Sequence, residues 1–177
     1  GCLGVPIVLE NLKKRNIKFS ACIIGEPTNM KVITAHKGYN EYKTFFYGIS
    51  GHASNPDKGV SAIEYAIQYS NKLLELKDEL KKKNLDNKIF SPSYSTLQIG
   101  KIFGGMSANV IADQCSLEWE FRPVNKNDED YVNKNIDDFT KNVLLPKMKN
   151  KNPNADIRKE IIGEVVGFKD DNQSVAA

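Results

Sequence analysis

The run Val110-Ile111-Ala112-Asp113-Gln114-Cys115-Ser116-Leu117-Glu118-Trp119-Glu120-Phe121-Arg122 carries the clearest strand pattern in the 177-residue chain. From Cys115 onward, large apolar side chains alternate with polar or charged ones. Because successive side chains of a strand point to opposite faces, this alternation predicts a strand with one buried and one solvated face. Strands of this kind are typical of an antiparallel sheet that is covered on one side only.

Further strands and helices are predicted on either side of this run. Residues 32–36, 39–49, 94–103 and 155–162 are short apolar or aromatic runs that favour strands. A long helix is expected at about 61–83, and a second helix is expected to start at Asn127 and to end or kink near Leu145, before Pro146. The apolar stripe of the long helix consists of Val60, Ile63, Ile67, Leu73, Leu74 and Leu80.

The order of these elements predicts the fold of residues 31–165. The elements follow one another in the order β-α-β-β-α-β. This order favours a four-stranded sheet with two helices on one face, which is the ferredoxin-like arrangement of the α/β (α+β) class. Such a sheet leaves its other face partly bare and its edges open. Open edges favour pairing with a second copy of the chain.

The first 30 residues have a different character. A helix is expected over 3–15, and Phe19–Ile24 is a continuous apolar run that is typical of a strand buried on both faces. That run leads to Gly25-Glu26-Pro27-Thr28, which places the Glu26 carboxylate at the carboxyl end of a strand, where sites of open α/β folds gather. Because the chain lacks an initiator Met and stops just after helix-capping residues at 170–174, we expect it to be a piece of a longer protein.

Composition excludes several classes of function. The net charge of +3 is small and scattered, which argues against nucleic-acid binding, and no window approaches the ~18 apolar residues that span a bilayer. The three cysteines, Cys2, Cys22 and Cys115, are odd in number and widely spaced. They are typical of reduced thiols in a cytoplasmic protein.

Four residues are candidates for a functional site, although each also has an ordinary structural explanation. His52 lies in the small-residue loop 49–56, where Gly51 leaves space for close approach and Gly59 is expected to free the backbone before the helix. Glu26 could bind a metal or accept backbone N–H bonds, and Asn109 could be a turn residue or a ligand contact. Arg122 could form an ion pair on its strand or grip a substrate carboxylate.

Six short motifs, taken in order, show a resemblance to a known family. Together they resemble the middle of the acetylornithine deacetylase, succinyl-diaminopimelate desuccinylase and aminoacylase family of co-catalytic zinc hydrolases. The motifs are Ile24-Gly25-Glu26-Pro27-Thr28, Ala35-His36-Lys37-Gly38, Ser50-Gly51-His52-Ala53-Ser54, Gly59-Val60-Ser61-Ala62-Ile63-Glu64, Gly104-Gly105 through Ala108-Asn109-Val110-Ile111, and Phe121-Arg122-Pro123.

The resemblance implies a two-domain hydrolase of which this chain is an internal segment. Residues 1–30 and 166–177 would belong to the α/β catalytic domain, and residues 31–165 would form a lid that also makes the homodimer. In such enzymes two zinc ions (cobalt is a possible substitute) polarise an amide carbonyl and activate a water molecule. The implied reaction is removal of the acetyl group from N-acetyl-ornithine, a step of arginine biosynthesis. A succinyl-diaminopimelate substrate or another N-acyl amino acid is the alternative.

The resemblance also assigns roles to the four candidate residues. Glu26 would ligate one zinc ion, and His52 would stabilise the oxyanion in the active site of the partner subunit. Asn109 and Arg122 would contact the substrate, with Arg122 on its carboxylate.

The remaining motifs of the family are absent from the 177 residues. These are the His-x-Asp motif, the Glu-Glu pair with the general base, the bridging Asp and the C-terminal His ligand. Since most zinc ligands are therefore missing, we expect the segment alone to be inactive and to bind zinc weakly. A freestanding ferredoxin-like dimerisation module without catalysis is the alternative from a different class.

Overall fold

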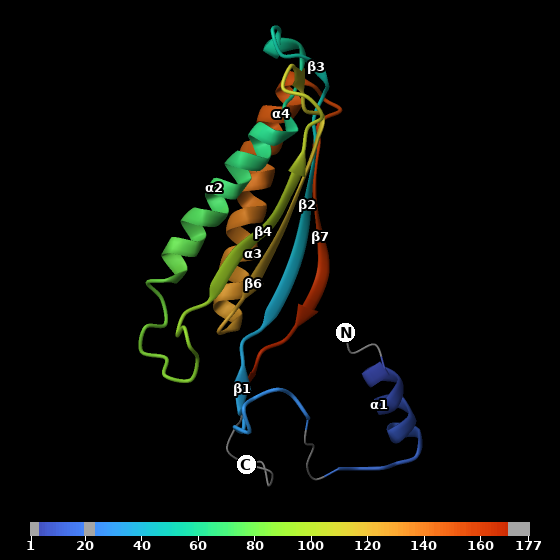
Figure 1. The fold of residues 1–177 in the computed structure, drawn as a ribbon, viewed down its shortest axis with the longest axis vertical. Helices are drawn as coiled ribbons and strands as arrows, with labels where there is room; N and C mark the ends of the chain where they lie inside the picture. The colour runs from blue at the N-terminus through green and yellow to red at the C-terminus, as the bar shows by residue number, and fades with distance from the viewer. Residues whose placement is uncertain (1–3, 20–23, 170–177) are drawn as a thin grey trace. The chain divides into compact units, whose positions relative to one another are not determined.

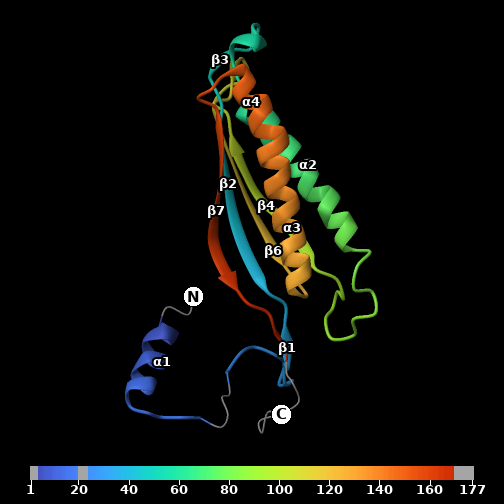
Figure 2. The ribbon, with the colours of Figure 1, turned by 180° about the vertical axis from the view of Figure 1, so that it is seen from behind.

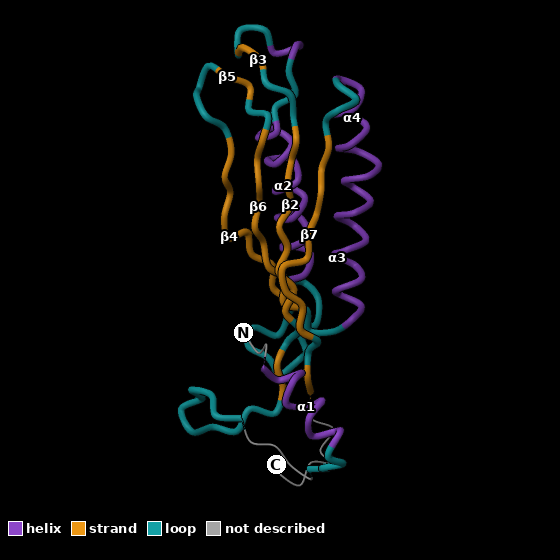
Figure 3. Tube along the Cα trace, turned by 90° about the vertical axis from the view of Figure 1, so that its right-hand side faces the viewer, coloured by secondary structure: helices purple, strands orange, loops and turns teal. Residues whose placement is uncertain are grey.

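Four antiparallel strands form a sheet in the computed structural model, which describes residues 4–19 and 24–169 (Figure 1). The strands are β2 (Tyr39–Tyr47), β4 (Thr96–Gly104), β6 (Gln114–Arg122) and β7 (Asp156–Val165). Their order across the sheet is β4-β6-β2-β7, as Figure 3 shows. In β6 the buried and solvated residues alternate as predicted, with Leu117, Trp119 and Phe121 on the buried face.

Two helical segments cover one face of this sheet (Figure 1). The first is α2 (Ala62–Leu80), and the second is made of α3 (Lys126–Phe139), a π-helical turn at Thr140–Leu144 and α4 (Leu145–Lys151). The side chains of Ser61 and Asn125 cap the two segments by accepting backbone N–H bonds. The order β2-α2-β4-β6-α3-β7 in a β4-β6-β2-β7 sheet is the ferredoxin-like topology, so the predicted fold is confirmed.

The chain divides into two compact units, residues 35–168 and residues 1–34 with 169–177. In the second unit, α1 (Gly4–Lys14) confirms the predicted first helix, and none of its residues is buried. The strand expected at Phe19–Ile24 lies largely outside the described residues. Two short strands, β1 (Ala35–His36) and β8 (Phe168–Lys169), pair with each other. No helix in the described part of the chain is long and apolar enough to cross a membrane.

The buried face of α2 differs from the predicted stripe. Ile67 and Leu74 are 49% and 46% exposed, although the prediction placed them toward the core. The prediction counted aliphatic residues, whereas the helix turns a mixture of alanines, tyrosines and leucines inward. The buried residues are Ala62, Tyr65, Ala66, Tyr69, Leu73, Leu76 and Leu80.

Of the two outcomes predicted for Pro146, an end or a kink of the second helical segment near Leu145, the end is wrong, because the segment continues to Lys151. Figure 2 shows α3, the π-helical turn and α4 as one continuous helix. Proline lacks an N–H group and its ring crowds the carbonyl one turn earlier. The wider turn at Thr140–Leu144, with π-type spacing, lies directly before Pro146 and accommodates this change in hydrogen bonding.

Two predicted strands are shorter than expected. Of residues 32–36, only Ala35 and His36 are in a strand, because β8 pairs with these two residues alone. The predicted strand 110–122 is interrupted at residues 112–113. Its first two residues form β5 (Val110–Ile111), which pairs with another segment and leaves the main sheet.

The core between sheet and helices contains a hydrogen-bonded polar chain as well as apolar side chains. Trp119 stacks on Tyr42 with ring centroids 4.3 Å apart, and its indole N–H donates to Thr44 Oγ1 over 3.2 Å. The Thr44 hydroxyl donates in turn to Tyr69 Oη over 3.3 Å. Burial raises the pKa of Tyr69, so its hydroxyl stays protonated.

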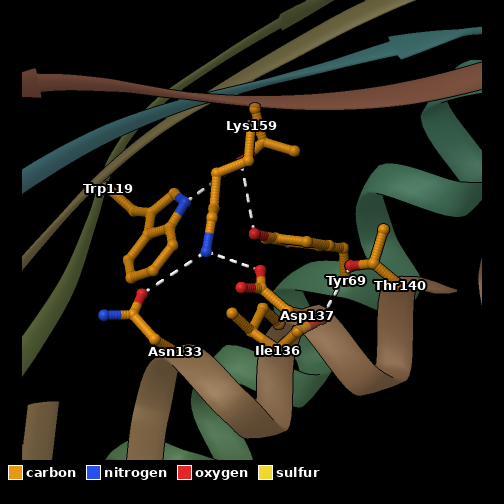
Figure 4. Close-up of polar contacts among 8 residues, drawn as sticks. Tyr69, Trp119, Asn133, Ile136, Asp137, Thr140 and Lys159 are labelled. Carbon is orange, nitrogen blue, oxygen red and sulfur yellow. Dashed lines mark hydrogen bonds and ion pairs between the residues drawn. The ribbon is translucent and has the colours of Figure 1, made fainter. Parts of the chain in front are cut away.

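Lys159 points from β7 toward Asn133 and Asp137, as Figure 4 shows. Its ammonium group donates to Asp137 over 2.5 Å and to Asn133 over 3.4 Å, both on α3. The same group lies 5.2 Å from the ring centroid of Tyr42. These contacts join β7 to α3 and help to hold the second helix on the sheet.

Candidate functional site

A short two-stranded sheet carries His52 at one end of the unit 35–168 (Figure 3). It consists of β3 (Gly51–His52) and β5, with His52 opposite Val110. A 3-10 turn at Pro56–Lys58 follows β3 and leads to α2. We call this end of the unit, residues 49–60 and 105–112, the tip.

The tip brings together two residues that are far apart in the sequence, His52 and Asn109. The amide of Ala53 donates to the carbonyl oxygen of Asn109 over 3.0 Å, directly beside the β3–β5 pairing. The side chains of His52 and Asn109 are both exposed. The sequence predicted both as site residues, and the structure places His52 in β3 and Asn109 in the loop directly before β5.

Each of these side chains is oriented by a serine two residues away. Ser54 Oγ lies 2.7 Å from the imidazole Nδ1 of His52, and the backbone N–H of Ser54 donates to the same nitrogen over 3.2 Å. On the other loop, the hydroxyl of Ser107 donates to Asn109 Oδ1 over 2.7 Å. The sequence prediction gave the serines no role, although a Ser at this spacing is a known partner for local turns.

Two glycines permit close packing inside the tip. A Cβ atom at Gly59 would lie 2.6 Å from Ile111 Cδ1 and 2.9 Å from the carbonyl oxygen of Ile49. The φ angle of Gly59 is −125°, which any residue adopts, so the prediction that Gly59 frees the backbone is wrong. At Gly51 a Cβ would lie 3.2 Å from Ile111 Cδ1, so this glycine provides space for Ile111 as well.

Arg122 lies at the opposite end of the main sheet. It is the last residue of β6, whose first residue, Gln114, is next to the tip. A strand of nine residues spans about 27 Å at ~3.4 Å per residue. The structure therefore separates Arg122 from His52 and Asn109 within one chain, and no single ligand of amino-acid size can reach all three there.

Arg122 forms a two-point contact with Glu120 on the solvated face of the sheet. Its Nε and Nη2 donate to the two carboxylate oxygens over 3.0 and 3.3 Å, and its guanidinium lies 5.1 Å from the ring centroid of Tyr39. The bond to Glu120 raises the pKa of Arg122. The ion pair that the sequence suggested is therefore present. The half-exposed guanidinium also has further N–H donors, which could bind a substrate carboxylate.

Lys37 adds a second cation near Arg122, which sequence reasoning did not single out. Its ammonium group donates to the carbonyl oxygen of Tyr94 over 2.7 Å. Burial, and then the charge of Arg122, lowers the pKa of Lys37. Lys37 lies in the Ala35-His36-Lys37-Gly38 motif, and this motif is the sequence signal that could have identified Lys37 as a candidate.

Glu26 lies in the other unit, in an exposed loop at residues 24–27. A carboxylate is a suitable zinc ligand, but a zinc site needs three or four ligands. Within residues 4–19 and 24–169, no group of three or more His, Cys, Asp and Glu residues could bind a metal ion. Among the described residues, Glu26 thus suits one ligand position of a zinc site, and the other ligands of a complete metal centre are not present.

A pocket of about 380 Å³ lies between the tip and the start of α2, but the candidate residues do not line it. Its walls include Ala53 and Ala108, the neighbours of His52 and Asn109, together with Ile63 and Ile111. The two polar side chains are instead exposed on the surface of the tip.

The sequence matches one family model and many curated proteins. The model of the peptidase dimerisation domain matches residues 34–148. An acetylornithine deacetylase of Buchnera aphidicola subsp. Schizaphis graminum is 40% identical over 112 residues, which are 63% of this chain and 29% of that protein. The acetylornithine deacetylase of Pasteurella multocida is 37% identical over 64% of this chain and 29% of its own length. The matched segment thus spans less than a third of these relatives.

Solved structures support the same fold. A tripeptidase from Staphylococcus aureus is 25% identical with a TM-score of 0.56, over 81% of this chain and 34% of that chain. The structure of AtUAH in complex with glyoxylate is 17% identical with a TM-score of 0.61, over 78% of this chain and 30% of that chain. In both cases the similarity covers about a third of the other protein.

Proposed function

The chain belongs to the peptidase dimerisation domain family, and from that premise we propose that it is the lid and dimerisation segment of a zinc-dependent N-acyl-amino-acid deacylase. N-acetyl-ornithine is the proposed substrate, as the names of the curated relatives suggest. The proposed setting is arginine biosynthesis in the cytoplasm, where the buried free thiol of Cys115 would stay reduced.

One observation carries the proposal: His52 and Asn109 share the tip, whereas Arg122 lies at the far end of the sheet. A site that uses all three residues on one small substrate must therefore take the tip from one subunit and Arg122 from another. In this arrangement His52 and Asn109 act in the active site of the partner, and Arg122 acts in the site of its own subunit.

The homodimer is proposed to form along β4 and the neighbouring flank of α2. On β4, an edge strand, Ile102 and Phe103 are 51% and 61% exposed. The exposed Ile67 and Leu74 lie two turns apart on α2, and the helix lies beside β4, where Lys77 donates to Gln98. An open edge next to an exposed apolar helix flank favours pairing with a second copy.

The other edge of the sheet suits this role less well. The first half of β7 carries charged residues, including Arg158, which pairs with Asp156, and Lys159, which pairs with Asp137 of α3. Charged side chains on an edge strand oppose pairing with another strand. The β4 edge is therefore the proposed dimer contact.

Within the assembled site, the residues of this chain would supply hydrogen bonds and charge. His52 would donate a hydrogen bond to the amide oxygen that becomes negative in the tetrahedral intermediate. Arg122 would bind the α-carboxylate of the amino acid, using N–H groups beyond those that Glu120 occupies. The zinc ions would polarise the amide carbonyl when bound, with Glu26 as one ligand.

Residues 1–30 and 166–177 are proposed to belong to the metal-binding catalytic domain. The helix α1 exposes Val5, Ile7, Val8 and Leu9 by 50–65%, and a folded catalytic domain would cover such a surface. Because Glu26 is the only metal ligand that the motifs assign to these 177 residues, the segment alone is proposed to be inactive and to bind zinc weakly.

A substrate comparison on the longer parent protein tests this proposal. The zinc-loaded protein should hydrolyse N-acetyl-ornithine with a higher kcat/KM than N-succinyl-diaminopimelate. The reverse preference would identify the desuccinylase alternative. No turnover of any N-acyl amino acid, with intact dimer formation, would leave the non-catalytic module as the better description.

A further inference from the structure

The two histidines of the chain have opposite hydrogen-bonding environments. At His52, Nδ1 receives the backbone N–H of Ser54 over 3.2 Å. At His36, Nδ1 lies 3.0 Å from the carbonyl oxygen of Lys37. A backbone N–H can only donate and a carbonyl oxygen can only accept, so these partners determine which ring nitrogen carries the proton.

We propose that Ser54 is a positioning residue that holds neutral His52 in the Nε2–H tautomer and thereby prepares it to donate a hydrogen bond. Because the amide of Ser54 donates to Nδ1, that nitrogen must present its lone pair. The proton of the neutral ring then lies on Nε2. The Ser54 hydroxyl, 2.7 Å from the same nitrogen, acts as a second donor and reinforces this choice.

The backbone around Ser54 holds this arrangement in place. Ala53 donates to the carbonyl oxygen of Asn109, and Asn55 donates to that of His52 over 2.9 Å. The residue between them, Ser54, is thus kept in a tight turn that aims its N–H at the imidazole. Among the described residues none bonds to Nε2 of His52, so this N–H group is available to a ligand.

The consequence for chemistry rests on the proposed function. An oxyanion is stabilised by an N–H donor and repelled by the lone pair of an unprotonated nitrogen. With the tautomer set in advance, His52 offers a donor to the partner's site without a change of protonation when the substrate reacts. In the opposite tautomer Nε2 would carry a lone pair and would not donate.

The 177-residue chain allows a direct test by nitrogen-15 NMR of the imidazole rings. Long-range proton–nitrogen spectra distinguish the two tautomers at alkaline pH, where histidine side chains are neutral. The chain has only two histidines, and His36 serves as an internal control because its Nδ1 should donate to the Lys37 carbonyl. We expect His52 to show the Nε2–H form and His36 the Nδ1–H form.

The variants Ser54→Ala and Ser54→Thr distinguish an effect of Ser54 on the tautomer of His52 from a general effect on the structure. In Ser54→Ala the loss of one donor should lower the Nε2–H fraction of His52, while Ser54→Thr should retain it and the His36 signals should stay unchanged. A wild-type His52 with the Nδ1–H form, or with the same mixture as the urea-unfolded chain, would overturn the proposal.

The activity of the parent protein gives a second, separate readout. Ser54→Ala should lower kcat several-fold with little change in KM, and Ser54→Thr should restore it. The NMR result does not depend on hydrolysis, so a correct tautomer with no deacylase activity would reject the proposed function alone. An Nδ1–H tautomer in an active enzyme would reject only the role of Ser54.

Discussion

Ala53, the residue after His52, donates its amide hydrogen to the carbonyl oxygen of Asn109 over 3.0 Å. This bond and the β3–β5 pairing place His52 and Asn109 together in the tip. Arg122 lies at the other end of β6, so the chain presents its two sets of candidate residues at opposite ends of one domain.

The first prediction concerns His52 as an oxyanion donor in the parent protein. His52→Ala should lower kcat by ~10²–10³-fold, the usual cost of losing one such donor, and should leave the dimer intact. Steady-state kinetics and sedimentation velocity measure the two effects. The matched control is His36→Ala, which removes the other histidine and should leave kcat within about twofold of wild type. An unchanged kcat in His52→Ala would remove His52 from the mechanism.

The second prediction concerns the dimer contact. Phe103→Glu places a charge on the exposed β4 edge and should weaken the dimer of the 177-residue chain at least about tenfold, as sedimentation velocity would show. Ile161→Glu makes the same change on β7, where the side chain is 62% exposed, and should leave the dimer intact. If Ile161→Glu dissociated the dimer and Phe103→Glu did not, the contact would have to be moved to the β7 edge.

The third prediction concerns the buried polar chain of the core. Thr44→Val removes the acceptor for the indole N–H of Trp119 and should lower the free energy of unfolding by about 1–3 kcal/mol, because the N–H stays buried without a partner. Thr44→Ser retains the hydroxyl and should cost less. Urea unfolding measures both. Equal stability of Thr44→Val and wild type would show that the hydrogen bond is not required.

The fourth prediction concerns the pH dependence of stability. Glu118 accepts from Lys101 and Lys43, at 2.8 and 3.0 Å, and these bonds lower the pKa of its carboxyl group below the ordinary value. A carboxyl group whose folded pKa is depressed stabilises the protein above its unfolded pKa, and this contribution is lost as the pH falls through the folded pKa. Glu118→Gln should therefore destabilise the chain at neutral pH and have little effect in strong acid.

Urea unfolding of Glu118→Gln at both pH values checks this dependence. Glu160→Gln is the control, since Glu160 is exposed on β7 and forms no ion pair in the described part of the chain. A Glu118→Gln effect that is the same at both pH values would show that the ion pairs do not account for it.

Some of the fold could be predicted because burial imposes a period on the sequence. The period-2 pattern of Cys115–Arg122 predicts a half-buried strand, and it is one. The break at residues 112–113 could not be predicted, because only the tertiary pairing decides that Val110 and Ile111 join β3. The inward face of α2 was predicted in part, since Tyr65 and Tyr69 take core positions that a count of aliphatic residues misses.

The candidate site could be predicted residue by residue but not as an arrangement. Each motif indicated one residue, and a local motif contains no information about which distant loops meet. The proximity of His52 to Asn109 depends on the pairing of β3 with β5, and the distance to Arg122 depends on the length of β6. The hydrogen bonds from Ser54 depend on a turn geometry that composition alone does not determine.

Complementation between inactive subunits of the parent protein tests the central claim most directly. Mixing His52→Ala with Arg122→Ala should restore about a quarter of wild-type activity, since random exchange makes half of the dimers mixed and each mixed dimer has one complete site of two. Mixing His52→Ala with Asn109→Ala should restore none, because both residues belong to the tip that serves the partner. Activity in the second mixture, or none in the first, would contradict the account.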